Sequence, residues 1–282
     1  MDNVTKRKKK TGFKDAILFI LFLALLAIPI YFAYTILLPK IEIFDHSKKE
    51  QTEEIEETEE IKEEDVYDGP PYLEVYETIE GQPVYITVPA PIDPEDPPKI
   101  ILYSHGSNTE VTFNTDDEFM QDLHAYGVFF TENDYIFAAS NQHGANWGNE
   151  ESIQDNINLI AWIKERYDTQ DKVNMIGYSM GGLPTMNFAS DYPERVNKIA
   201  LLAPTTRSNE WNEERVAKIE EIDIKIWHGT ADVNVGYSLS TTFVNTLESF
   251  GKEVELVTLE GKTHWDIDTQ YMEDILEFFN QE

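Results

Sequence analysis

Cysteine is absent from this chain of 282 residues. Its absence excludes disulfides, thiolate metal sites and cysteine nucleophiles, so packing must stabilise the fold and covalent catalysis would need another nucleophile. Basic residues are also scarce, with 22 Lys and Arg against 53 Asp and Glu, which gives a formal net charge of −31. Because so acidic a chain repels phosphate backbones, we expect no nucleic-acid partner.

Two common ligand-binding motifs are missing as well. No H-E-x-x-H spacing indicates a metal site, and no G-x-G-x-x-G follows a strand-like run. We therefore predict no metal and no cofactor. What the chain does have is 41% hydrophobic and 12% aromatic residues, which is typical of a globular domain with a substantial core.

The longest hydrophobic run lies near the amino terminus, over residues 16–39, "AILFILFLALLAIPIYFAYTILLP". As a helix this uncharged run would extend about 35 Å, enough to cross a lipid bilayer. A cleaved signal peptide is the alternative, but its apolar region is shorter and ends at a small-residue cleavage site, which is missing here. We predict an uncleaved signal anchor, that is, a transmembrane helix at 16–39.

Charge predicts how this helix is oriented. Residues 1–15 carry six Lys and Arg side chains, which is typical of a tail that stays in the cytoplasm. Residues 40–70 are dominated by Glu and Asp, with few aliphatic residues, and such a segment cannot bury enough apolar surface to fold. We predict a flexible acidic stalk at 40–70 and one folded domain at 71–282, outside the cytoplasm at the cell membrane.

The pattern of apolar runs after residue 70 predicts the fold class. Two alternating runs, "YLEVYETI" and "PVYITVPA", indicate an antiparallel hairpin at the start of the domain. Six unbroken apolar runs follow, at 99–106, 135–140, 173–179, 198–204, 224–229 and 254–261, with helical patterns between them such as 149–167 and 237–250. Unbroken runs are typical of strands covered on both faces. We predict an α/β three-layer sandwich with a mostly parallel twisted sheet and this hairpin.

The run at 173–179 leads into "GYSMG", residues 177–181, which matches G-x-S-x-G at a strand-to-helix junction. Ser179 could be an ordinary helix N-cap. As a nucleophile on a strained turn, it would need a positive φ and glycines on both sides, where no Cβ fits. Pro184 would break an intrahelical hydrogen bond in a helix starting just after Ser179, so we expect an irregular first turn.

Partners for a nucleophilic serine follow later in the chain. Asp232 comes just beyond the strand-like run "IKIWHG", and His264 comes just beyond the next run, "VELVTLEG". Such a serine requires a base, and the base requires an acid that orients it. Asp232 is the preferred acid; other acids expected near this face are Asp223, Asp266 and Asp268.

Together with "YSHGSN" at 103–108, these motifs resemble the α/β-hydrolase superfamily over residues 72–281. The resemblance implies that Ser179 is the nucleophile, His264 the general base and later acid, and Asp232 the residue that fixes the imidazole tautomer. It further implies an oxyanion hole made by the backbone N–H groups of Ser107 and Met180. Only about twenty residues separate the runs ending at 204 and beginning near 224, which leaves no room for a cap domain.

Four further polar or aromatic residues lie at strand ends outside the triad. His105 and His228 each precede a glycine, and we interpret both as structural members of their loops. His105 is also a candidate, with Asn146 and Trp147, for lining a substrate pocket, because "HGANWG" follows the carboxyl end of a strand.

The resemblance implies a serine hydrolase that works through an acyl-enzyme, and with the anchor predicted above we expect it to be membrane-anchored, outward-facing and most suited to carboxylic esters. Thioesters, peptide bonds and acyl transfer to an acceptor other than water remain open, because enzymes with the same triad carry out all of them. A non-catalytic surface binding protein is the hypothesis from another class. The expected partners are an acyl substrate and, through the amino-terminal helix, a lipid bilayer. The sequence indicates neither the acyl chain length nor the oligomeric state.

Overall fold

The computed structural model describes residues 69–281. The cytoplasmic tail, the transmembrane helix and nearly all of the stalk predicted above lie outside the described residues. Among residues 69–281, no helix combines the length and apolar character needed to cross a membrane.

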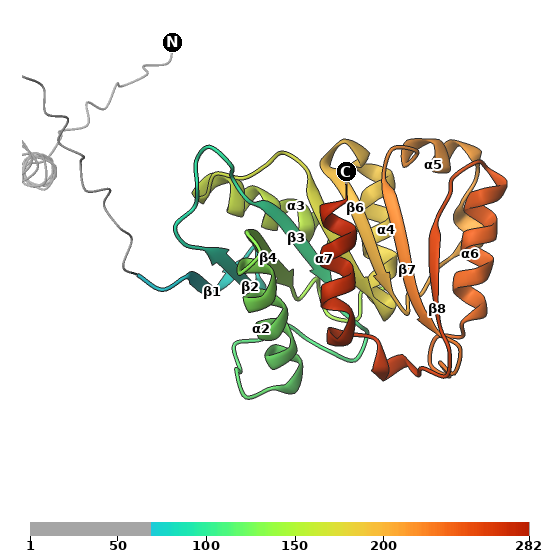
Figure 1. Cartoon of the computed structure of the whole chain (residues 1–282), viewed down its shortest axis with the longest axis horizontal. Helices are drawn as coiled ribbons and strands as arrows, with labels where there is room; N and C mark the ends of the chain where they lie inside the picture. Colours follow the sequence, from blue (N-terminus) through green and yellow to red (C-terminus); the bar gives the residue numbers. More distant parts are fainter. Residues whose placement is uncertain (1–68, 282) are drawn as a thin grey trace, which may run out of the picture. The chain divides into compact units, whose positions relative to one another are not determined.

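Eight strands form one sheet (Figure 1). Their order across the sheet is β1-β2-β4-β3-β5-β6-β7-β8. The strands are β1 (Tyr72–Ile79), β2 (Gln82–Pro89), β3 (Lys99–Ser104), β4 (Tyr135–Ser140), β5 (Val173–Tyr178), β6 (Val196–Leu202), β7 (Asp223–Gly229) and β8 (Glu255–Leu259). The predicted hairpin is β1 and β2, which pair antiparallel and join the sheet through an antiparallel β2–β4 pair. Every other pair is parallel.

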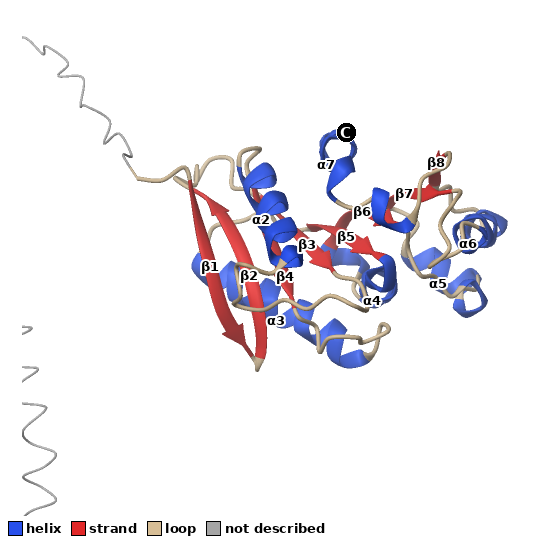
Figure 2. Ribbon diagram, turned by 90° about the horizontal axis from the view of Figure 1, so that it is seen from below, coloured by secondary structure: helices blue, strands red, loops and turns tan. Residues whose placement is uncertain are grey.

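Helices cover both faces of the sheet. They are α2 (Glu118–Thr131), α3 (Glu150–Arg166), α4 (Gly182–Asp191), α5 (Glu213–Lys218), α6 (Ser238–Ser249) and α7 (Met272–Asn280). Figure 2 shows α2 and α7 on one face and α3 to α6 on the other. The three-layer sandwich predicted from alternating apolar runs is therefore confirmed for the described part of the chain.

Each helical layer has its own apolar core against the sheet. Leu159, Phe188 and Phe243 pack on the face covered by α3 to α6. Tyr126, Phe137 and Phe279 pack on the face covered by α2 and α7. Unbroken apolar runs formed the central strands because their side chains alternate between these two dry interfaces.

Helix α3 differs from the expected pattern. Its isoleucines at three- and four-residue spacing predict an apolar face, and Ile160 and Ile163 are buried accordingly. Ile153 and Ile157 are only half-buried, whereas the polar Asp155 and Asn156 are buried. Asn156 accepts a hydrogen bond from the buried amide of Gln142 at 2.8 Å. This face of α3 therefore packs partly through polar contacts with the loop after β4, which apolar periodicity cannot indicate.

The parallel arrangement gathers the motif-bearing loops at one edge. Strands β3, β5, β7 and β8 run in the same direction, so the segments that follow their last residues all lie at the carboxyl ends. The motifs around Ser107, Ser179, Asp232 and His264 occupy these four segments. Only the short helix α5 and a 3-10 turn at Ser208–Glu210 lie between β6 and β7, and no cap domain interrupts residues 203–222.

Candidate active site

Ser179 sits on a sharp turn between β5 and α4. Its φ is +54°, in the left-handed region that non-glycine residues seldom adopt. Residues Ser179–Gly181 form a 3-10 turn, and α4 begins only at Gly182. Pro184 is therefore the third residue of α4, where its missing N–H would have had no intrahelical partner. The strained turn and the delayed helix together explain how the proline is accommodated.

The glycines around Ser179 fill positions where a side chain would collide. A Cβ at Gly177 would lie 2.8 Å from the carbonyl oxygen of Gly181. A Cβ at Gly181 would overlap the carbonyl group of Ser104 at the end of β3. Both contacts are with backbone, which cannot move aside cheaply. The close approach holds the turn against β3 and so fixes where the Ser179 hydroxyl lies.

Three side chains from different loops meet at this turn. The Oγ of Ser179 is 3.0 Å from Nε2 of His264, and Nδ1 of His264 is 2.7 Å from Oδ2 of Asp232. The exposed fractions of Ser179, Asp232 and His264 are 8%, 7% and 3%. Nearly dry hydrogen bonds of this length allow His264 to take a proton from Ser179 while Asp232 stabilises the resulting imidazolium.

Asp232 is held as an acceptor from two directions. Its Oδ1 accepts the backbone N–H groups of Asn234 at 2.9 Å and Val235 at 2.8 Å. Of the other acids considered, Asp266 caps its own turn by accepting from Thr263 at 2.9 Å, and Asp268 accepts from two tyrosines. Among the described residues, Asp232 is the only acid whose side chain is in hydrogen-bond contact with the His264 ring.

The loop after β3 passes directly beside Ser179. A Cβ added to Gly106 would lie 3.6 Å from the Cβ of Ser179. The backbone N–H of the next residue, Ser107, has no hydrogen-bond partner within residues 69–281. A free N–H on this loop and the N–H of Met180 at the start of the turn are the two donors expected of an oxyanion hole.

Two of the predicted pocket residues, His105 and Asn146, are buried within their loops. His105 has no exposed surface, and its two ring nitrogens lie 2.7 and 2.9 Å from the carbonyl oxygens of Gly106 and Asn141. Asn146 is buried and bonds to Gly144 and Gly148 within its own loop. These two side chains hold their loops together, and neither lines the cavity described below, so their assignment to a substrate pocket stays a prediction.

Trp147 stands apart from those two residues. It is 48% exposed, and its backbone N–H contacts the sulfur of Met180 at 3.4 Å, so it lies at the surface near the Ser179 turn. Its assignment to a substrate pocket stays a prediction.

A cavity of about 670 Å³ lies between the segments 108–122 and 265–270. Its lining includes Asn108, Phe119, Asp122, Tyr178, Trp265 and Asp268, and none of the three predicted pocket residues. The sequence did not indicate that these residues line one cavity, because the two segments are far apart in the chain and no motif joins them. The one available signal was the proximity of Trp265 and Asp268 to His264. Among residues 69–281, no group of His, Asp and Glu side chains is arranged to hold a metal ion.

Comparisons with known proteins agree with this architecture. A family model described as "alpha/beta hydrolase fold" matches residues 133–259. A 2-hydroxy-6-oxo-6-phenylhexa-2,4-dienoate hydrolase from Burkholderia cepacia is 50% identical over 34 residues, 12% of each chain. The uncharacterized carboxylesterase nap of Bacillus subtilis (strain 168) is 40% identical over 60 residues, 19% of this chain and 20% of that one. This chain thus matches a fifth or less of the length of these curated relatives.

The fold is also found among solved structures. The structure of Est1E from Butyrivibrio proteoclasticus aligns with a TM-score of 0.52 at 17% identity, covering 73% of this chain and 95% of that one. A likeness at this identity concerns the fold alone.

Proposed function

Because this chain belongs to the α/β-hydrolase superfamily, we propose that it is a membrane-anchored, outward-facing serine hydrolase that cleaves carboxylic esters through a triad of Ser179, His264 and Asp232. The observation that carries the proposal is the chain of hydrogen bonds at 3.0 and 2.7 Å through His264. The short segment between β6 and β7 supports an open site that an ester can enter.

The reaction follows from these positions. Ser179 Oγ attacks the ester carbonyl carbon while its proton passes to Nε2 of His264, and the oxyanion is stabilised by the N–H groups of Met180 and Ser107. Collapse of the tetrahedral intermediate breaks the bond to the alcohol oxygen, which takes the proton from His264. Water then attacks the acyl-enzyme and gives a proton to His264. When this second intermediate collapses, His264 returns the proton to Ser179 Oγ, and the carboxylic acid is released.

A fluorophosphonate probe tests the nucleophile in the full-length chain purified in detergent. We expect the wild type to be labelled and to hydrolyse short p-nitrophenyl esters, and Ser179→Ala to lose both properties. Ser249→Ala is the matched control, because Ser249 is exposed at the end of α6. Labelling of Ser179→Ala at the wild-type rate would overturn the assignment. A protein that reacts with neither probe nor ester would favour the binding-protein hypothesis.

The membrane anchor rests on sequence alone, because residues 16–39 lie outside the described residues. An uncharged run of this length behind a basic segment supports it. In cells, the full chain is expected to remain with membranes after alkaline carbonate washing, and external protease is expected to remove the domain that contains Ser179. Recovery of the full chain in the carbonate wash would contradict the anchor without bearing on the triad.

A further inference from the structure

The cavity lies next to the triad, because the rings of two of its lining residues, Tyr178 and Trp265, have their centroids 5.2 and 5.3 Å from that of His264. Tyr178 lines it and directly precedes Ser179, and Trp265 lines it and directly follows His264. Asn108 lies one residue beyond Ser107 and also lines it. A substrate whose carbonyl reaches Ser179 could therefore extend one end into a space of about 670 Å³, large enough for a small organic group.

Charge in this cavity is of one sign. Its carboxylates are those of Glu110, Asp117, Glu118, Asp122 and Asp268, and no Lys, Arg or His lines it. A partly enclosed space bordered only by negative side chains attracts cations and repels carboxylate or phosphate groups.

Asp268 is the carboxylate most firmly positioned. Its Oδ1 accepts the hydroxyl groups of Tyr103 at 3.1 Å and Tyr126 at 2.9 Å, and both tyrosine rings are fully buried. Its Oδ2 has no hydrogen-bond partner within residues 69–281 and is not among the buried unpartnered atoms, so it is open to the cavity. Burial, and to a smaller extent the neighbouring Asp122 carboxylate, raises the pKa of Asp268 to about 6, against the lowering effect of the two tyrosine hydroxyls.

Aromatic rings supply the remaining lining. Trp265 is 56% exposed, and Tyr178 and Phe119 lie on the same cavity. Carboxylates combined with aromatic faces bind organic ammonium groups, because the ring face attracts the cation and tolerates its methyl or methylene surface.

We propose that this cavity binds an ammonium group of the substrate, so that the enzyme prefers esters carrying a positive charge near the scissile bond. This inference rests on the proposed hydrolase function and names its substrate class. The ammonium group can come from the acyl half, as in an aminoacyl ester, or from the alcohol half, as in a choline ester. Both sources offer the same chemistry to Asp268 and Trp265.

Two isosteric ester pairs test the proposal with the full-length chain in detergent. Alanine ethyl ester is compared with ethyl isobutyrate, in which a methyl group replaces the ammonium group. Acetylcholine is compared with 3,3-dimethylbutyl acetate, in which carbon replaces nitrogen. In one of the pairs, kcat/KM is expected to favour the charged ester by about tenfold or more. The pair that shows the preference identifies the half of the substrate that enters the cavity.

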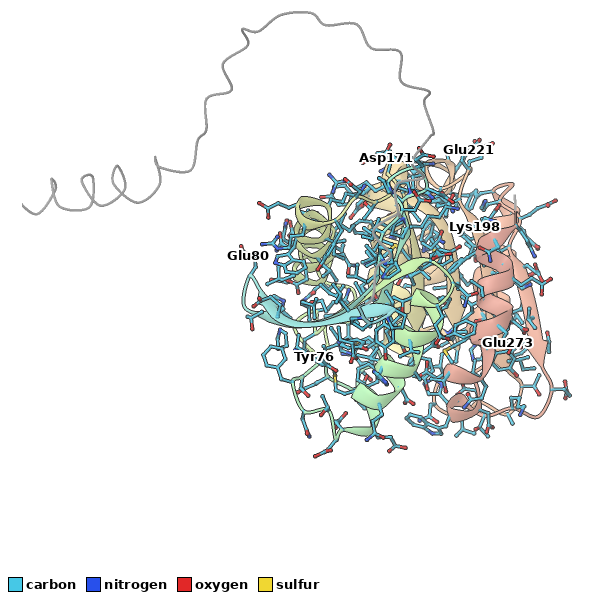
Figure 3. The ribbon with its side chains drawn as sticks, turned by 60° about the vertical axis from the view of Figure 1, so that its left-hand side comes forward. Tyr76, Glu80, Asp171, Lys198, Glu221 and Glu273 are labelled. Carbon is cyan, nitrogen blue, oxygen red and sulfur yellow. The ribbon has the colours of Figure 1, made fainter. Side chains whose placement is uncertain are left out.

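Variants locate the preference. Asp268→Asn keeps an acceptor for the two tyrosines but removes the charge, and Asp122→Asn removes a second charge at the partly exposed surface of α2. Each is expected to lower the charged-to-neutral ratio at least threefold. Asp171→Asn is the matched control, because Asp171 is exposed just before β5, at the end of the strand opposite Ser179, where Figure 3 labels it. The control is expected to keep the wild-type ratio.

The outcomes separate the two proposals. Equal kcat/KM within both pairs, or a preference that Asp268→Asn and Asp122→Asn leave unchanged, overturns the ammonium site while the hydrolase stands. Failure to turn over any of the four esters, with no fluorophosphonate labelling of Ser179, overturns the hydrolase function and this inference with it.

Discussion

The Nε2 atom of His228 lies 3.2 Å from Oδ2 of Asp232, the same oxygen that Nδ1 of His264 approaches at 2.7 Å. His228 is fully buried; its Nε2 is also 2.8 Å from the carbonyl of Val235, and its Nδ1 is 2.7 Å from the hydroxyl of Ser240. Since the groups facing Nε2 only accept, Nε2 carries the proton and Nδ1 accepts from Ser240. Burial lowers the pKa of His228, so it is neutral at pH 7 and positions Asp232 without cancelling its charge.

Replacing His228 by leucine should therefore weaken catalysis without removing a reacting group. We expect kcat to fall by about tenfold, because Asp232 loses a donor that orients it. His228→Gln, which retains a donor, should recover part of the rate, and His124→Gln, at an exposed position on α2, is the control. Equal kcat values for His228→Leu and His228→Gln would leave His228 with a packing role only.

Gly177 and Gly181, the glycines on either side of Ser179, lead to a prediction about stability. Gly181→Ala would drive a Cβ into the carbonyl group of Ser104, so we expect loss of folded protein or a drop in the free energy of unfolding of about 3 kcal/mol or more. Gly236→Ala is the matched control, because a Cβ there would have its nearest contact at 3.6 Å, with the Ser238 hydroxyl. Thermal unfolding of the two purified variants measures the difference. Equal melting temperatures would contradict the close approach between the Ser179 turn and β3.

Local patterns in the sequence were sufficient to predict the sheet. Each central strand was an unbroken apolar run. The segments after β5, β7 and β8 carry Ser179, Asp232 and His264, which is the chain order expected from the resemblance. Topology then brings these three together without further information, because parallel strands end at one edge. Their catalytic roles stay predictions until the probe and the variants are tested.

The cavity could not be predicted in this way. Its most firmly held carboxylate, Asp268, depends on Tyr103 and Tyr126, which are 165 and 142 residues earlier in the chain. Tyr126 belongs to no motif, and Tyr103 begins the motif at 103–108, but nothing in that motif indicates that both hydroxyls point to Asp268. The predicted pocket residues show the same limit: His105 and Asn146 follow strand ends, but position after a strand does not say whether a side chain is buried within its own loop.

Selectivity for charged esters should depend on pH through Asp268. The tyrosines around it, Tyr103, Tyr126 and Tyr178, have pKa values raised by burial and stay neutral, whereas the neighbouring Asp122 also has a raised pKa. Since the pKa of Asp268 is about 6, lowering the pH from 7.5 to 5 should protonate it and reduce the charged-to-neutral ratio of kcat/KM. The acetylcholine pair is the one to use, because its quaternary ammonium group keeps its charge at every pH and the ratio cancels pH effects on the triad that both esters share. In Asp268→Asn the ratio should change less over this range, and a ratio independent of pH in the wild type would count against the site.

The same carboxylate should cost the enzyme stability at neutral pH. The pKa of Asp268 is about 6 in the folded chain, against a reference value of 3.8. Between these values the folded state holds a proton that the unfolded state releases, so this residue's contribution to the free energy of unfolding falls as pH rises toward 6 and stays low above it. At pH 7.5, Asp268→Asn should therefore melt higher than the wild type, by roughly 2–4 °C for each kcal/mol recovered, and the difference should vanish near pH 4. Asp171→Asn, at an exposed site, should melt with the wild type at both pH values. Residues needed for function often reduce stability, so replacing them tends to stabilise the fold. A lower melting temperature for Asp268→Asn at pH 7.5 would mean instead that the Asp268 charge stabilises the fold, and it would contradict this prediction.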